Sequence, residues 1–279
     1  MLYYPPINSA GTLVQLPYKR GFNFSNVVQG NPTGRPYSFA MIGGGLTNFP
    51  NNPLGSFAIT YSTLTDAERA VVKNFVENVA VGSLKTFAYI DTNGNLVTAS
   101  ENVSDASWTL SGVTINATAP DPYGGDLASA VTATVSSATL RTTVIPTGSV
   151  SGFTFNLSVW VKPPTLAQTM TLSFLDASNT VLTSAQFNVP GGAWKRISLP
   201  YVCTTTGALQ VQITINSYGS ATLSLFAAQC VATAGAGPYL RSPGSVGLHP
   251  KCRLDIDSFP WKFVQAGSTG VVIPIQEIM

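Results

Sequence analysis

Residues 57–68 read Phe-Ala-Ile-Thr-Tyr-Ser-Thr-Leu-Thr-Asp-Ala-Glu, and this stretch decides the fold of the N-terminal part of the chain. Its first five residues alternate as those of a half-buried strand do. Thr65 is placed to cap a helix, and Glu68, three residues later, completes a capping box. The stretch therefore predicts a strand that leads directly into a capped helix.

The helix should run to about residue 79 and carry one apolar stripe. At helical spacing the stripe consists of Ala67, Val71, Phe75 and Val79, whereas Glu68, Lys73 and Glu77 lie off it. Gly82 should end the helix, and residues 84–90 should return as a strand. Because an apolar stripe needs a cover, we expect the helix to pack on a sheet.

Composition limits the possible classes of function. Of the 279 residues, 44% are hydrophobic and only 9% are charged, and the formal net charge is +2. Such a chain can bury large cores and favours β-rich architecture with neutral polar surfaces, which suit assembly or sugar binding. Specific binding of nucleic acid is not expected, because it normally requires a basic patch.

The sequence also bears on the cellular setting. No apolar run reaches the roughly 20 residues that span a bilayer, so membrane insertion is not expected. Residues 1–6 lack the pattern of a secretory signal, which predicts synthesis in a cytoplasm. Three cysteines cannot all pair with one another, and their spacing is unlike that of zinc ligands, so we expect buried thiols at Cys203, Cys230 and Cys252.

From about residue 102 the pattern changes to period-two alternation interrupted by turn residues. The odd positions of residues 153–161 are apolar and should face a core, and residues 209–216 follow the same rule. Met170, Leu172 and Phe174 repeat it from even positions. Several such strands without a helix between them predict two antiparallel sheets packed face to face.

The pattern of the sequence changes again near the end of the chain. Residues 231–247 are rich in Ala, Gly, Ser and Pro and are typical of a linker, and short extended segments follow at residues 253–257, 261–263 and 271–278. About thirty residues are too few for an independent domain, so they should complete the N-terminal sheet. We predict a mainly β fold with one principal helix: a split α+β domain formed by residues 1–98 and 244–279, with an antiparallel jelly roll inserted at residues 99–243.

Three segments near the chain ends carry a resemblance to a known family. They are Leu-Pro-Tyr-Lys-Arg-Gly-Phe-Asn-Phe at residues 16–24, the strand and helix start at residues 57–68, and the closing residues 252–278. Together they resemble the distal tail protein family of long-tailed bacteriophages and gene transfer agents. Their motifs are patterns of aromatic and apolar positions rather than catalytic groups.

This resemblance implies a structural virion protein at the tail tip, made in the cytoplasm of a bacterial host. Its subunits would form a ring, most often a hexamer, that joins the tail tube protein to the hub or tip protein. Residues 1–55 would supply arms that bind neighbours. Within them, residues 43–45 and 48–53 fit either a mobile loop that orders on contact or an ordinary surface loop.

Four segments of the middle region carry a second resemblance. In chain order they are Leu-Ser-Val-Trp-Val-Lys-Pro at 157–163, Gly-Gly-Ala-Trp-Lys-Arg-Ile-Ser at 191–198, Leu-Phe-Ala-Ala-Gln at 225–229 and Gly-Pro-Tyr-Leu at 237–240. They resemble a jelly-roll carbohydrate-binding module of phage tail and fibre proteins. Cys230 stands where acidic or apolar residues are common. The resemblance implies a domain that either binds a host cell-surface polysaccharide or only decorates the tail.

Trp160 is the first candidate for contact with a glycan. Its parity places it on the polar face of its strand beside Asn156 and Ser158, and an aromatic ring flanked by amide and hydroxyl groups suits a sugar. Hydrogen bonds from a neighbouring strand could come from Gln210, Gln212 and Asn216. A loop or the tail-ring domain could instead cover Trp160.

Three further polar or aromatic positions have plain structural explanations. Trp194 follows a Gly-Gly turn and is expected to pack at an edge rather than to bind a ligand. Tyr123 and Asp126 belong to a segment that fits a turn as well as a loop site.

Catalytic chemistry finds little support in the sequence. Asp255 and Asp257 share one face of a strand, but Arg253 lies on the same face and could neutralise them. His249 is the only histidine and lies in a segment expected to be a linker, without a nucleophile motif. The motifs of nucleotide-binding and zinc-dependent enzymes are missing. We therefore expect no enzyme activity, no cofactor and no metal.

The leading prediction is a distal tail or baseplate ring subunit with an outward jelly roll. The alternative is a receptor-binding or fibre component of the tail tip that is attached through its terminal segments. A third class, a polysaccharide-cleaving enzyme, would depend on Asp255 and Asp257.

Overall fold

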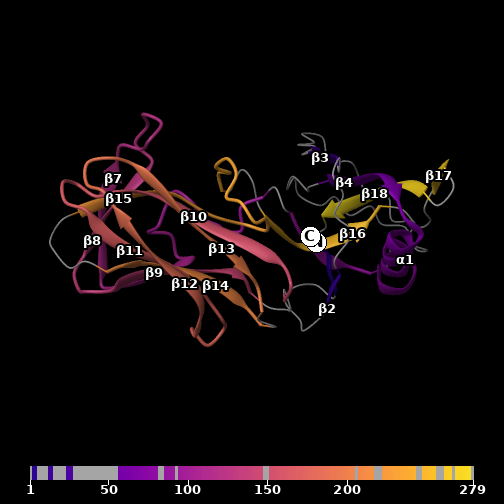
Figure 1. The fold of residues 1–279 in the computed structure, drawn as a ribbon, viewed down its shortest axis with the longest axis horizontal. Helices are drawn as coiled ribbons and strands as arrows, with labels where there is room; N and C mark the ends of the chain where they lie inside the picture. Colours follow the sequence, from indigo (N-terminus) through magenta and orange to yellow (C-terminus); the bar gives the residue numbers. More distant parts are fainter. Residues whose placement is uncertain are drawn as a thin grey trace, which may run out of the picture. The chain divides into compact units, whose positions relative to one another are not determined.

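The computed structural model describes residues 2–4, 12–14, 23–27, 56–80, 85–91, 94–146, 151–204, 207–216, 222–242, 247–255, 261–265 and 268–277 (Figure 1). Within these residues the chain is mainly β with one principal helix, as predicted. The Cα trace divides into two compact units: unit 1 comprises Met1–Leu13 and Ala88–Pro250, and unit 2 comprises Val14–Phe87 and Lys251–Met279.

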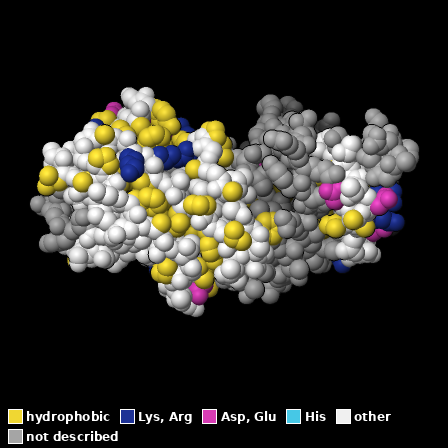
Figure 2. Space-filling view, viewed as in Figure 1, with side chains coloured by type: hydrophobic (Ala, Val, Ile, Leu, Met, Phe, Trp, Pro, Cys, Tyr) yellow, Lys and Arg dark blue, Asp and Glu magenta, His cyan; other side chains and the backbone are white. Residues whose placement is uncertain are grey.

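The surface carries few charges. The whole chain has 14 basic and 12 acidic residues, and on the face drawn in Figure 2 most of the described surface is neither acidic nor basic. No helix in the described part of the chain is both long and apolar enough to cross a membrane.

One sheet is built from both ends of the chain, in the strand order β2-β1-β5-β16-β18-β4-β3, and β17 pairs with β18. β18 runs antiparallel to β4, and Ile273 lies opposite Ile59. Strands separated in sequence by the whole sandwich are therefore hydrogen-bonded neighbours, which confirms the predicted pairing. The bounds are β1 (Leu2–Tyr4), β2 (Thr12–Val14), β3 (Asn23–Val27), β4 (Ser56–Leu64), β5 (Phe87–Ile90), β16 (Leu248–Leu254), β17 (Lys262–Gln265) and β18 (Ser268–Glu277).

Helix α1 (Asp66–Asn74) begins with the predicted capping box. The Thr65 hydroxyl accepts a hydrogen bond from the backbone N–H of Glu68, and the Glu68 carboxylate accepts one from the backbone N–H of Thr65 at 2.7 Å. The helix continues as a π-helical turn, η1 (Phe75–Ala80). It contacts both β4 and β18, so it packs where the two chain ends meet.

The predicted apolar stripe of this helix is wrong at its N-terminal half. Ala67 is exposed and Val71 is 41% exposed. The side chains that are buried are Val72, Phe75, Val76 and Ala80. A four-residue spacing advances about 40° around an α-helix at each step, so a stripe traced in steps of four rotates away from the covered face.

Residues 108–231 form two five-stranded antiparallel sheets that pack face to face (Figure 1). The β10 sheet has the order β13-β10-β15-β8-β7, and the β14 sheet has the order β12-β11-β14-β9-β6. The bounds are β6 (Trp108–Ser111), β7 (Val113–Ala119), β8 (Ala128–Ala133), β9 (Ala138–Ile145), β10 (Thr154–Lys162), β11 (Gln168–Leu175), β12 (Val181–Val189), β13 (Lys195–Val202), β14 (Leu209–Ile215) and β15 (Thr222–Val231).

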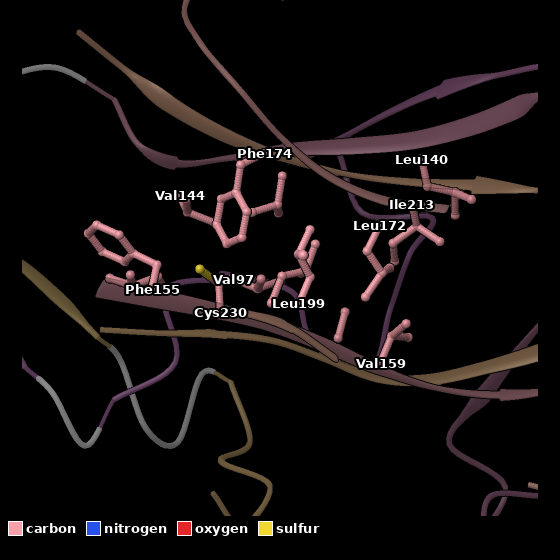
Figure 3. Close-up of a cluster of buried hydrophobic side chains, with 14 of the residues drawn as sticks. Val97, Leu140, Val144, Phe155, Val159, Leu172, Phe174, Leu199, Ile213 and Cys230 are labelled. Atoms are coloured by element: carbon pink, nitrogen blue, oxygen red, sulfur yellow. The ribbon is translucent and has the colours of Figure 1, made fainter. Parts of the chain in front are cut away.

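The core between these sheets follows the predicted alternation. The odd residues of β10 and β14 are buried, and so are Met170, Leu172 and Phe174 of β11. Figure 3 shows side chains of the two sheets pointing toward one another, with Phe155, Val159 and Leu199 on one side and Phe174 and Leu172 on the other. Apolar burial of this kind contributes roughly 25 cal/mol per Å² and is the main stabilising term of the sandwich.

Residues 233–242, which we name the strap, lie against the β10 sheet instead of forming a free linker. Gln229 of β15 is fully buried, and its Nε2 donates to the backbone oxygens of Ala236 and Pro238 at 2.6 and 3.2 Å. Its Oε1 accepts from the backbone N–H of Leu240 at 2.8 Å. The predicted linker at residues 231–247 is therefore corrected for its described part, because buried amide groups hold it to the sheet.

Several other predictions meet the structure at single residues. Cys203, Cys230 and Cys252 are buried free thiols, as predicted, and burial raises the pKa of Cys230. His249 belongs to strand β16 rather than to a linker, and its ring stacks on that of Tyr89 at 6.0 Å. The predictions for residues 43–45, 48–53, 82 and 257 lie outside the described residues.

Candidate functional site

The candidate site lies on the outer face of the β10 sheet, the face that points away from the sandwich core. Trp160 stands there, opposite Arg196 of β13 and Phe226 of β15 in the strand registers. Its neighbours Val159 and Val161 are buried in the core, so Trp160 faces outward as its parity predicts, and it is partly exposed.

A β-bulge in β15 places a second aromatic ring beside Trp160. Ser158 pairs with Gln229, but Trp160 pairs with Phe226, so β15 carries one extra residue between these pairs. Ala227 lies in the bulge with a φ of 57°, a conformation that costs roughly 1–2 kcal/mol for a residue other than glycine. Bulges re-aim side chains, and here Phe226 joins the outer face although Leu225 and Ala228 face the core.

Four rings make up what we name the aromatic cluster: Tyr123, Trp160, Phe226 and Tyr239. The Tyr123 ring lies edge-on to Trp160 at 6.3 Å and to Phe226 at 6.0 Å between ring centroids. The Tyr239 ring, from the strap, lies 5.4 Å from that of Phe226. Tyr123 is 68% exposed, so the cluster presents an aromatic surface to solvent.

The loop of residues 121–127 holds Tyr123 in place through one carboxylate. Asp121 is buried and accepts hydrogen bonds from the backbone N–H groups of Tyr123, Gly125 and Leu127 at 2.7, 3.2 and 3.4 Å. Burial acts to raise the pKa of the Asp121 carboxyl, but these backbone donors outweigh it and hold the pKa below its ordinary value.

We expect Asp121→Asn to destabilise the sandwich near neutral pH and to matter less in acid. The pKa of Asp121 is lower in the folded state, so its contribution is present above the ordinary value of 3.8 and is lost as pH falls through the folded pKa. The midpoints of urea unfolding of wild type and Asp121→Asn, compared at about pH 7 and about pH 3, measure this contribution to stability. Asp126→Asn is the control, because Asp126 is exposed in the same loop. If Asp121→Asn lowered stability equally at both pH values, the result would contradict the account.

Arg196 fastens the strap below the aromatic cluster. Its guanidinium donates to the backbone oxygen of Gly237 at 2.5 Å and, through Nη2, to the Ser158 hydroxyl at 3.0 Å. Burial lowers the pKa of Arg196 from its ordinary value. Within the described residues, two buried donors on these paired strands lack an acceptor: the Nε of Arg196 and the Nε1 of Trp160. An unpaired buried donor costs about 1–3 kcal/mol.

The five residues predicted to bind glycan do not come together. Asn156 lies on the same face as Trp160 but is only 3% exposed, and its Nδ2 donates to the backbone oxygen of Ala234 at 3.0 Å. Gln210, Gln212 and Asn216 belong to β14 and its C-terminal end, hence to the other sheet. The prediction that they lie on a strand neighbouring Trp160 is therefore wrong.

The three amides near β14 are occupied by local hydrogen bonds. Gln210 donates to the backbone oxygen of Asp176 at 2.9 Å, Gln212 to the Thr214 hydroxyl at 3.1 Å, and Asn216 to the Thr171 hydroxyl at 2.6 Å. The alternation along a strand predicts which side chains point away from the core. It does not predict to which of the two sheets the strand belongs, and the prediction failed for this reason.

Phe226, Tyr239 and Arg196 are site residues that sequence reasoning did not single out. The Phe226 position depends on the bulge, which no local pattern announces. The Tyr239 position depends on Gln229 and Arg196, which hold the strap. Only Tyr123 had a local signal, because an aromatic residue within a Pro and Gly turn is often exposed.

No protein-family model matches the chain, and no curated protein matches it. Similar solved structures include the enzymatically active domain of tailspike protein 4 from bacteriophage CBA120, at 19% identity and a TM-score of 0.38. That match covers 50% of this chain and 21% of the tailspike domain.

Two carbohydrate-binding modules also match part of the chain. The CBM22-1 xylan-binding domain of Paenibacillus barcinonensis Xyn10C matches at 16% identity and a TM-score of 0.40, over 52% of this chain and 99% of that one. The C-terminal family 22 module of Clostridium thermocellum Xyn10B matches at 18% identity and a TM-score of 0.42, over 53% and 99%. Identities and TM-scores of this size transfer no function to this chain.

Proposed function

We propose that this protein is a structural component of a bacteriophage-type tail: a ring subunit at the distal end that joins the tail tube to the tip hub. In this proposal residues 99–243 form an inserted jelly roll that faces outward, and the protein acts by binding rather than by catalysis. The observation that carries the proposal is the antiparallel pairing of β4 with β18, which makes one sheet from two of the three segments that resemble the distal tail protein family.

The described surface is compatible with assembly into a ring. A closed ring repeats one heterologous interface, which requires two different complementary surfaces on each subunit. Val71 of α1 and Val272 of β18 are 41% and 46% exposed, and each is an apolar side chain left on the surface of unit 2. Few charges oppose close packing of copies.

The purified full chain should form a closed oligomer, with six copies as the expected number. Light scattering after size exclusion measures the mass, and negative-stain electron microscopy shows whether the particles are rings. A protein that stays strictly monomeric at every concentration and salt condition, and on the virion, would count against the ring.

Antibody labelling of particles separates a ring at the tube end from the alternative, a peripheral receptor-binding spike.

We further propose that the aromatic cluster contacts a host-surface glycan. Flat aromatic surface beside polar groups is the common way to hold a sugar ring, and Tyr123 and Trp160 provide it on one face. On an array of bacterial surface polysaccharides, Tyr123→Ala should weaken binding at least about tenfold, equal to roughly 1.4 kcal/mol. Trp160→Ala should abolish it.

Controls separate lost contact from lost folding. Tyr123 is mostly exposed, so Tyr123→Ala removes the ring without opening the core. Leu166→Ala is the matched control, because Leu166 is 75% exposed on a turn outside the cluster and should leave binding unchanged. A wild-type protein that binds no glycan on the array would leave the jelly roll as decoration only.

A further inference from the structure

A groove lies beside the aromatic cluster, along the edge of the sandwich that β7 forms. Its volume is 790 Å³, which lies within the range of ligand-binding clefts. One wall comes from the segment before β6 and the other from β7 and the loop that precedes β8. The lining residues that matter here are Glu101, Asn102, Asp105, Asn116, Leu127 and Arg241.

The charges of the groove are fixed by short contacts. Glu101 forms an ion pair with Arg241 at 2.8 Å and accepts a hydrogen bond from the Tyr239 hydroxyl at 3.1 Å. The backbone N–H of Ser107 donates to Asp105, and this lowers the pKa of the Asp105 carboxyl. Since Glu101 and Arg241 neutralise each other, the lining carries about one net negative charge and repels anionic ligands.

The remaining polar groups of the groove are neutral and partly free. Asn116 donates through Nδ2 to the Thr132 hydroxyl at 2.7 Å, and its Oδ1 has no partner in the described part of the chain. Asn102 accepts hydrogen bonds from Ser104 through Oδ1, which leaves the donors of its Nδ2 without a described partner. Amide donors and acceptors beside the apolar side chain of Leu127 suit a hydroxylated ligand.

The groove and the aromatic cluster share two structural elements. Tyr239 packs its ring against Phe226 of the cluster and sends its hydroxyl to Glu101 in the groove. The loop of residues 121–127 carries Tyr123 in the cluster, and its last residue, Leu127, lines the groove. The two features are therefore adjacent, and one extended ligand can occupy both.

We infer that the groove binds further residues of a neutral oligosaccharide whose first sugar lies on the aromatic cluster. This inference rests on the proposed glycan contact and adds two properties to it. Affinity depends on chain length, because only a longer chain reaches from the rings into the groove. Acidic sugars are disfavoured, because Asp105 leaves the groove negative.

The test uses the full-length protein and an array that carries neutral disaccharides, neutral hexasaccharides and matched hexasaccharides containing uronic acid. Wild type should prefer the neutral hexasaccharides. Asn116→Ala should weaken their binding about three- to tenfold, the range for one hydrogen bond, and leave disaccharide binding unchanged. Asp105→Asn should narrow the preference for neutral over acidic hexasaccharides. Asn188→Ala, exposed on β12 of the other sheet, is the control and should change nothing.

The outcomes separate this inference from the proposed function. Binding that is lost in Tyr123→Ala but unchanged in Asn116→Ala and Asp105→Asn would overturn the inference and leave the proposed glycan contact standing. Equal affinity for disaccharides and hexasaccharides would overturn the inference as well. A wild type that binds no glycan on this array would overturn both.

Discussion

Asn95→Ala should lower the free energy of unfolding of the sandwich by about 3–5 kcal/mol. Asn95 is 2% exposed and makes four hydrogen bonds to the backbone. Its Nδ2 donates to the oxygens of Ala228 and Leu240 at 3.1 and 3.0 Å. Its Oδ1 accepts from the N–H groups of Val97 and Cys230, both at 3.0 Å.

The large effect follows from where these bonds lie. Asn95 joins the segment before β6 to strand β15 and to the strap, so its loss leaves buried backbone groups of three elements without partners. Each unpaired buried group costs about 1–3 kcal/mol, whereas a hydrogen bond exchanged with water contributes only about 1 kcal/mol. The expected total is therefore well above that of an ordinary polar substitution.

Urea unfolding followed by tryptophan fluorescence measures this loss. Asn102→Ala is the matched control, because Asn102 also accepts two hydrogen bonds, from Ser104, but is exposed to water. Asn102→Ala should lower the free energy of unfolding by less than about 1 kcal/mol. Equal losses in the two variants would show that Asn95 does not join these elements.

Ile273→Asp should lower the free energy of unfolding of unit 2 by more than about 4 kcal/mol and so unfold this unit. The sandwich should stay folded. Ile273 of β18 is fully buried opposite Ile59 of β4, so the variant would place a carboxylate in the core that the two chain ends share. Val272→Asp is the matched control on the same strand. Val272 is 46% exposed on the other face, and a charge there should cost little.

Hydrogen exchange with peptide resolution separates the two units. In Ile273→Asp, peptides from β4, α1 and β18 should lose protection, while peptides from β10, β11 and β14 keep it. Loss of protection throughout the chain would contradict independent cores. Unchanged protection of the β4 amides would show that the stability of β4 does not depend on β18.

The parts of the fold that sequence predicts correctly are those set by local rules. The capping box at Thr65 depends on two residues three apart, and the core face of β10 depends on a period of two. Both could be identified without the rest of the chain. The pairing of β4 with β18 was also predictable, because a short tail with an unpaired apolar strand needs a partner elsewhere.

The parts that sequence misses depend on contacts between distant segments. The bulge at Ala227 moves Phe226 to the outer face through a register shift against β10. The strap lies on the sheet because Gln229 and Asn95 bind its backbone, and neither residue carries a local signal. Parity alone placed Trp160 and Gln210 on polar faces, but only the strand order shows that these faces belong to different sheets.

The central claim, that strands from the two chain ends form one sheet, is tested most directly by a disulfide across it. Thr60 and Val272 are opposite residues of β4 and β18 on the partly exposed face. The double variant Thr60→Cys with Val272→Cys should form an intramolecular disulfide under native, mildly oxidising conditions, detected by mass spectrometry of the digest. Thr60→Cys with Gln276→Cys, on the same face but four residues out of register, should stay reduced. Crosslinking of both pairs alike, or of neither, would contradict the split sheet on which the proposed function rests.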